Sequence, residues 1–186
     1  MLPWNDPSLV VASDPPRRAM RRRLQGWWRE HRLGLPPGRD ASGIIRNNLP
    51  PPEALLAHPM ANFLAPEIAA YVQERVPMVL AGGGTLDEDR LWRNLLSSMP
   101  MCFNLFGMLR AFPEPASRVL SVATGLPIHQ VEEIDVEWIP DGGHPLGDRT
   151  AFDALVTYRD GQGRRGFLGV ETKYTEPFSR KVYDKA

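Results

Sequence analysis

The sequence has little cysteine, little lysine and no net charge. One cysteine, Cys102, in 186 residues excludes a disulfide framework and a multi-cysteine zinc site, and predicts a reducing, cytoplasmic location. Apolar runs are too short for a membrane span, so we expect a protein that does not enter the membrane. The length fits about one ordinary domain. Only three of the 22 cationic residues are lysine, namely Lys173, Lys181 and Lys185.

The zero net charge excludes the uniform basic surface of a protein that coats DNA, so any nucleic-acid binding has to be local. Positive charge is concentrated near the N-terminus, in a basic stretch that also contains Trp27 and Trp28. These arginines are candidates for contacts with nucleic-acid phosphates: Arg17, Arg18, Arg21, Arg22 and Arg23. The alternative is a helix that packs its tryptophans on the domain and leaves its arginines in solvent.

Helical signals dominate the first two thirds of the chain. Apolar spacing predicts helices over 17–33, 65–76, 85–98, 101–109 and 115–124, with a short one near 52–57. Thr85 and Glu88 fit a capping box that starts the helix over 85–98. Prolines between 34 and 66 predict an extended arm there. We therefore expect a basic, proline-rich extension over 1–66 and a domain over 67–186.

From residue 131 the pattern changes to the two-residue period of β-strands. Alternating residues predict strands over 131–138, 151–158 and 166–174, and the turn at 160–163 favours an antiparallel meander.

Three charged residues on the last two strands indicate chemistry. Glu171 and Lys173 share one face of the third strand, because side chains alternate. Asp153 is an isolated carboxylate in an apolar strand, where desolvation is costly unless a partner is present. If the hairpin brings the three residues together, a divalent cation with oxygen ligands relieves the repulsion between the carboxylates. The alternative is an ordinary pair of Glu and Lys on a surface strand.

The order of Phe152-Asp153, 17 residues, and Glu171-Thr172-Lys173 on consecutive strands resembles the PD-(D/E)XK nuclease superfamily. More narrowly, 94–106 and 170–176 are similar to uncharacterised bacterial proteins classed with restriction endonucleases. The resemblance implies an α/β (α+β) fold with a restriction-endonuclease-like core, in which N-terminal helices precede the meander. It also implies Mg²⁺, or Mn²⁺, held by Asp153 and Glu171, and a catalytic lysine at Lys173.

The sequence departs from the superfamily pattern in two places. Position 152 is Phe where the superfamily motif has Pro, and 13 residues follow Lys173, where the core usually continues with a helix and a fourth strand. The expectation is a shortened core, or a core that a partner or a second copy completes. Glu137 and Glu88 are candidates for an additional acid, although a solvated strand face and the capping box, respectively, also explain them.

Two functions follow from these features. The first is a Mg²⁺-dependent endonuclease that hydrolyses DNA phosphodiester bonds at Asp153, Glu171 and Lys173. The second is a non-catalytic module for binding nucleic acid or protein that retains a degenerate nuclease fold.

Overall fold

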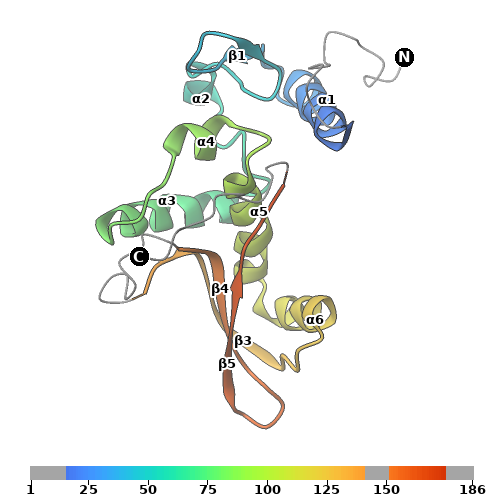
Figure 1. The fold of residues 1–186 in the computed structure, drawn as a ribbon, viewed down its shortest axis with the longest axis vertical. Coiled ribbons are helices and arrows are strands. Elements are labelled where there is room, and N and C mark those ends of the chain that lie inside the picture. Colours follow the sequence, from blue (N-terminus) through green and yellow to red (C-terminus); the bar gives the residue numbers. More distant parts are fainter. Residues whose placement is uncertain (1–15, 141–150, 175–186) are drawn as a thin grey trace, which may run out of the picture.

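A computed structural model describes residues 16–140 and 151–174 of the chain, without the side chains of Pro16 and Arg17. The fold mixes helices with two small antiparallel sheets (Figure 1). In chain order the elements are α1 (Pro16–His31), β1 (Gly38–Arg39), β2 (Ile45–Arg46), α2 (Ala54–Ala57), α3 (Pro66–Ala81), α4 (Glu88–Arg93), α5 (Ser98–Ala111), α6 (Pro113–Thr124), β3 (Gln130–Trp138), β4 (Phe152–Arg159) and β5 (Arg165–Val170).

The larger sheet is the predicted antiparallel meander, with the strand order β3-β4-β5. Helices α3, α5 and α6 contact β3, and α5 also contacts β4. The core between them includes Ile68 and Val72 of α3, Phe103 of α5, and Val136 and Val156 of the sheet, all of them fully buried. One apolar face of the sheet is thus covered by helices.

Four predicted helices agree with the structure in position. The N-terminal basic helix is α1, the helix at 101–109 lies within α5, and the helix at 115–124 lies within α6. Gly125 ends α6 in the left-handed conformation, with φ of 72°, which a residue without a Cβ adopts readily. Helix α3 begins near the predicted residue 65 but continues to Ala81 through Pro77, which is exposed on the helix surface.

The predicted helix over 85–98 is wrong at its end and in its cap. Helix α4 ends at Arg93, and Asn94 has an extended conformation. Its side-chain Oδ1 accepts a hydrogen bond from the backbone N–H of Leu96 at 3.0 Å, so the polar side chain offers the backbone a turn in place of a helix. The cap is Asp87, whose carboxylate accepts from the N–H of Arg90 at 3.0 Å, so Thr85 and Glu88 do not form the capping box.

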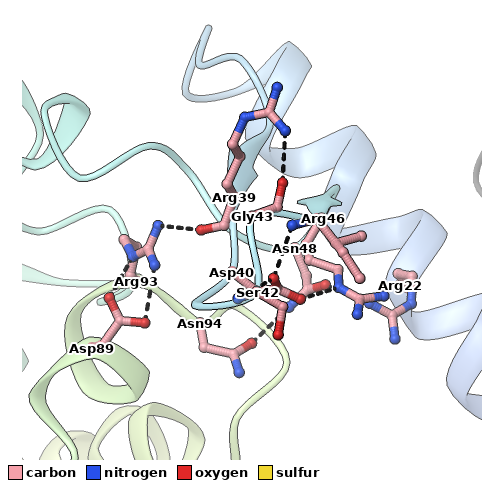
Figure 2. Close-up of polar contacts among 11 residues, drawn as sticks. Arg22, Arg39, Asp40, Ser42, Gly43, Arg46, Asn48, Asp89, Arg93 and Asn94 are labelled. Atoms are coloured by element: carbon pink, nitrogen blue, oxygen red, sulfur yellow. Dashed lines mark hydrogen bonds and ion pairs between the residues drawn. The ribbon is translucent and has the colours of Figure 1, made fainter.

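The predicted extended arm contains a small hairpin, β1–β2, that the sequence did not indicate. Arginines from two helices fix this hairpin and the chain that follows it (Figure 2). From α1, buried Arg22 donates to Asn48 Oδ1 at 2.7 Å. From α4, buried Arg93 pairs with Asp89 and donates to the carbonyls of Arg39 and Pro50 at 3.2 and 3.1 Å.

No helix in the described parts of the chain is long and apolar enough to cross a membrane.

Candidate active site

The pairing of β4 with β5 sets the position of the predicted site. Ala154 pairs with Val170, and this is the last register position of the two strands toward this end of the sheet. Asp153 of β4 and Glu171, the first residue after β5, come directly beyond this pair. The predicted hairpin is present, and Asp153 and the start of the Glu-x-Lys segment lie at the same end of it.

Strand β5 ends at Val170, so the prediction that it continues to Tyr174 is wrong. The reason lies in Asp153, whose Oδ2 accepts hydrogen bonds from the backbone N–H and the Oγ1 of Thr172, at 2.5 and 2.8 Å. The N–H of Thr172 therefore bonds to a carboxylate and not to a carbonyl of β4. Thr172 is buried, and the bonds hold the Glu-x-Lys segment against the start of β4.

Lys173 and Glu171 flank this buried threonine. The Lys173 ammonium forms an ion pair and a hydrogen bond with Glu171 Oε1. The side chains are 27% and 52% exposed, respectively, so solvent and a substrate reach both of them. The ion pair between Lys173 and Glu171 is present, and Thr172, the residue between them in sequence, bonds to the Asp153 carboxylate.

Glu137 adds a third carboxylate. Glu137 belongs to β3, which pairs with the edge of β4 that faces away from β5. The neighbouring pairs Val136 with Ala154 and Trp138 with Phe152 place Glu137 opposite Asp153. Burial, followed by the negative charges of Asp153 and Glu171, raises the pKa of the Glu137 carboxyl to about 7. The three acids thus lie close enough to act on one another electrostatically.

The backbone at Glu137 is unusual. Its φ is 51°, and among the described residues no other non-glycine residue has a positive φ. Arg75 of α3 supports this end of β3, with Nε donating to the Val136 carbonyl at 2.7 Å and Nη2 to the Glu137 carbonyl at 3.3 Å. Left-handed backbone at a residue with a Cβ costs about 1–2 kcal/mol, and such strain is concentrated at functional sites.

Cys102 supports the site from the core side. The thiol of this fully buried residue of α5 donates to the backbone carbonyl of Asp153 at 3.1 Å. Burial, with a further contribution from the Asp153 charge, raises the pKa of the thiol far above its ordinary value. The prediction that Cys102 belongs to the core is confirmed.

Glu88 is in a different environment from Glu137. It is the first residue of α4 and its side chain is exposed. The negative charges that raise the Glu137 pKa belong to Asp153 and Glu171, and Glu88 does not contribute to it. Of the two candidates for an additional acid, Glu137 is the one that the structure brings to Asp153.

The predicted nucleic-acid-binding arginines lie on α1 and have different surroundings. Arg22 is buried and bonded to Asn48, as shown in Figure 2, and Arg21 bonds to Tyr174. Arg18 and Arg23 are half-buried, and the side chain of Arg17 lies outside the described residues. Trp27 and Trp28 of the same helix line a cavity of about 470 Å³ between α1, the turn at 61–64 and α5, and Tyr174 contributes to its wall.

A family model with the description PD-(D/E)XK nuclease superfamily matches residues 12–186. This match covers almost the whole chain and includes the site at the end of β4 and β5. The chain belongs to the PD-(D/E)XK nuclease superfamily. Neither the curated proteins nor the solved structures gave a significant match.

Nucleases of this superfamily usually use divalent metals, so we compared the residues of the site with such an ion. Within 16–140 and 151–174, no three His, Cys, Asp or Glu side chains lie close enough together to hold a metal. Mg²⁺, however, commonly keeps several waters and binds through one or two carboxylates. Asp153 and Glu171 offer that donor set, and their negative charges, which contribute after burial to the raised pKa of Glu137, are charges that a cation would balance.

Sequence reasoning missed two parts of this superfamily site. Thr172 was expected only as the residue facing away from Glu171 and Lys173, whereas it bonds directly to Asp153. The contact of α1 with Tyr174 joins residues 153 positions apart, and no local pattern signals it. The alternation of charged and apolar residues around 172 was the one signal for the buried threonine.

Proposed function

We propose that this chain is a divalent-metal-dependent nuclease that hydrolyses phosphodiester bonds of DNA at Asp153, Glu171 and Lys173. The observation that supports the proposal best is that β4 and β5 pair as far as Ala154 and Val170, so that Asp153 and the Glu-x-Lys segment follow at the same end of the sheet in a member of a nuclease superfamily. Chance Glu-x-Lys patterns are common, but they do not require an aspartate at the same end of the neighbouring strand.

Asp153 and Glu171 are the residues that would hold Mg²⁺ or Mn²⁺. When bound there, the ion would polarise the scissile phosphate and lower the pKa of a coordinated water. Both hydrogen bonds from Thr172 go to Oδ2 of Asp153, and they fix the orientation of the carboxylate. Glu171 is half-exposed and meets the solvent from which substrate arrives.

Lys173 contributes the positive charge of the site. An ammonium at the proposed metal site would hold an attacking water or balance the negative charge that develops on the phosphate. In the absence of substrate its charge is paired with Glu171. A guanidinium is bulkier and more rigid, so lysine suits this role better in a chain that otherwise uses arginine.

Glu137 is our candidate for the additional acid. Its carboxyl has a pKa near neutrality, so it is able to hold or release a proton at physiological pH. Glu88 has no such environment and is the weaker candidate.

DNA is the proposed substrate, and α1 is the proposed phosphate-binding element. The helix carries six arginines and one acid, Glu30, which gives it a local positive charge on a chain of zero net charge. Trp28 at the adjacent cavity provides a surface for apolar contact.

The proposal predicts that Asp153→Asn and Lys173→Ala each reduce metal-dependent nicking of supercoiled plasmid by about 100-fold or more, the usual scale for a positioned proton-transfer group. The assay compares equal concentrations of protein with Mg²⁺, with Mn²⁺ and with EDTA. Glu133→Gln, an exposed acid on β3, and Lys181→Ala serve as controls and keep wild-type activity.

Circular dichroism of each variant establishes that it is folded. Nicking by folded Asp153→Asn or Lys173→Ala at the wild-type rate would contradict the assignment of these residues. A wild-type chain that binds DNA and metal without cleavage would favour the non-catalytic module.

A further inference from the structure

Tyr174, the residue after Lys173, is attached to the N-terminal helix by three contacts. Arg21 Nη1 donates a hydrogen bond to the Tyr174 carbonyl, and the Arg21 guanidinium carbon lies 4.5 Å from the centre of the Tyr174 ring. Gln25 Nε2 donates to the Tyr174 hydroxyl at 3.1 Å. Arg21 and Gln25 are four residues apart and therefore lie on the same face of α1. In Figure 1 the chain that leaves β5 runs toward this helix.

Thr172, the residue before Lys173, is attached to the sheet. Thr172 donates its backbone N–H and its hydroxyl to Asp153 Oδ2. Lys173 therefore lies between one residue bound to β4 and one residue bound to α1. After β5 has ended, these contacts take the place of ladder hydrogen bonds in fixing the backbone of the Glu-x-Lys segment.

Helix α1 is itself held by the rest of the molecule. Arg22 bonds to Asn48, and Arg29 donates to the carbonyls of Asn47, at 2.9 Å, and of Leu35. Both arginines are buried. Because α1 is anchored through residues other than Arg21 and Gln25, its contact with Tyr174 constrains the position of Tyr174.

We propose that Arg21 and Gln25 are positioning residues that hold the Lys173 ammonium beside Glu171 by fixing Tyr174. The kinetic consequence rests on the nuclease function proposed above, whereas the structural consequence at Lys173 does not. Arginine suits the position, because one planar guanidinium both donates to a carbonyl and stacks on an aromatic ring. A helix that would be expected to bind only DNA thus also orders the site.

The scarcity of lysine permits a direct test. Biosynthetic labelling with ¹³C at the lysine ε carbon gives signals from three side chains only, and Lys173→Arg identifies the signal of Lys173. We expect the Lys173 signal of the wild type to differ from that of a free lysine, because of its ion pair with Glu171. In Arg21→Ala it moves toward the free-lysine position.

Arg32→Ala, an exposed arginine just after α1, is the matched control and leaves the Lys173 signal unchanged. Gln25→Ala and Tyr174→Phe each remove one side of the same hydrogen bond, so they shift the signal equally and the double variant adds nothing. These two variants test the proposal if Arg21→Ala fails to fold. A Lys173 signal that stays at its wild-type position in folded Arg21→Ala, or in both of the milder variants, would overturn it.

In the nicking assay, Arg21→Ala is expected to lower kcat by about tenfold with little change in KM, since misplacement of a reacting group by a fraction of an ångström costs rate. A lower affinity for DNA with unchanged kcat would instead assign Arg21 to phosphate binding and contradict the positioning role. If the wild type does not cleave, the proposed function fails, and the NMR comparison still decides whether α1 positions Lys173.

Discussion

Glu137 is the residue at which charge and backbone strain coincide. It lies opposite Asp153, its φ is 51°, and its pKa is raised from an ordinary 4.5 to about 7, chiefly by burial. In the native protein this carboxyl binds a proton at pH values where the unfolded chain has already released it. The contribution of Glu137 to the free energy of unfolding is therefore fully present below pH 4.5 and is lost as the pH rises toward and past 7.

Replacing Glu137 with Gln removes this dependence on pH. The unfolding free energy of Glu137→Gln relative to the wild type should rise by about 2 kcal/mol between pH 5 and pH 8, measured by urea denaturation in metal-free buffer. Glu133→Gln, on the exposed part of the same strand, is the control and shows no such rise. Parallel stability curves for Glu137→Gln and the wild type would show that the carboxyl titrates normally.

At the level of residues, much of the site could be predicted. The isolated Asp153 and the Glu171-Thr172-Lys173 spacing indicated one end of the β4–β5 hairpin, and the strand register has both segments at that end. The bonds from Thr172 to Asp153 could not be predicted, because they form only where β5 stops. The conformation of Glu137 is likewise a result of tertiary packing, with Arg75 bonded to its carbonyl.

At the level of elements, arginine side chains supply many of the hydrogen bonds that hold helices, strands and loops to one another. Guanidinium groups donate to backbone carbonyls of loops and of strands at many places: Arg29 to Leu35 and Asn47, Arg39 to Gly43, Arg75 to Val136 and Glu137, Arg93 to Arg39 and Pro50, Arg110 to Ile134, and Arg159 to Gly163. One guanidinium has five donors in a fixed plane, and an ammonium cannot reach as many separated acceptors. The preference for arginine over lysine therefore has a structural reason.

Arg93 provides the clearest test of this reason. It is 5% exposed and links the Asp89 carboxylate to two carbonyls of the β1–β2 region. Arg93→Lys leaves buried acceptors without donors, and we expect a loss of about 2–3 kcal/mol in unfolding free energy, measured by urea denaturation. Arg118→Lys, on the exposed side of α6, is the control and changes the unfolding free energy by less than about 0.5 kcal/mol. Equal midpoints for Arg93→Lys and the wild type would contradict the structural role.

The elements with strong periodicity were predicted and the others were not. Helices α5 and α6 and the meander β3–β5 have apolar residues at regular spacing, and packing on a common core reinforces that pattern. The hairpin β1–β2 has strands of two residues each, which are too short for a periodic signal. The hairpin depends on Arg22 and Arg93, which reach it from helices before and after it in the chain.

At the level of the whole molecule, helix α1 from the first part of the chain contacts the segment that follows β5. The basic helix α1 contacts Tyr174 directly after Glu171-Thr172-Lys173, while α5 supports Asp153 through Cys102. The zero net charge thus conceals a separation between a basic helix and a group of three acids, Glu137, Asp153 and Glu171. Such a separation suits a protein that binds a polyanion with one part and a metal cation with another.

Titration calorimetry with Mn²⁺ tests whether Asp153 and Glu171 together hold a divalent cation. We expect one site per chain in the wild type, a loss of affinity of at least about tenfold in Asp153→Asn and in Glu171→Gln, and wild-type affinity in Glu133→Gln. A folded wild-type chain that binds no Mn²⁺, or variants at both carboxylates that bind it as tightly as the wild type, would contradict the claim.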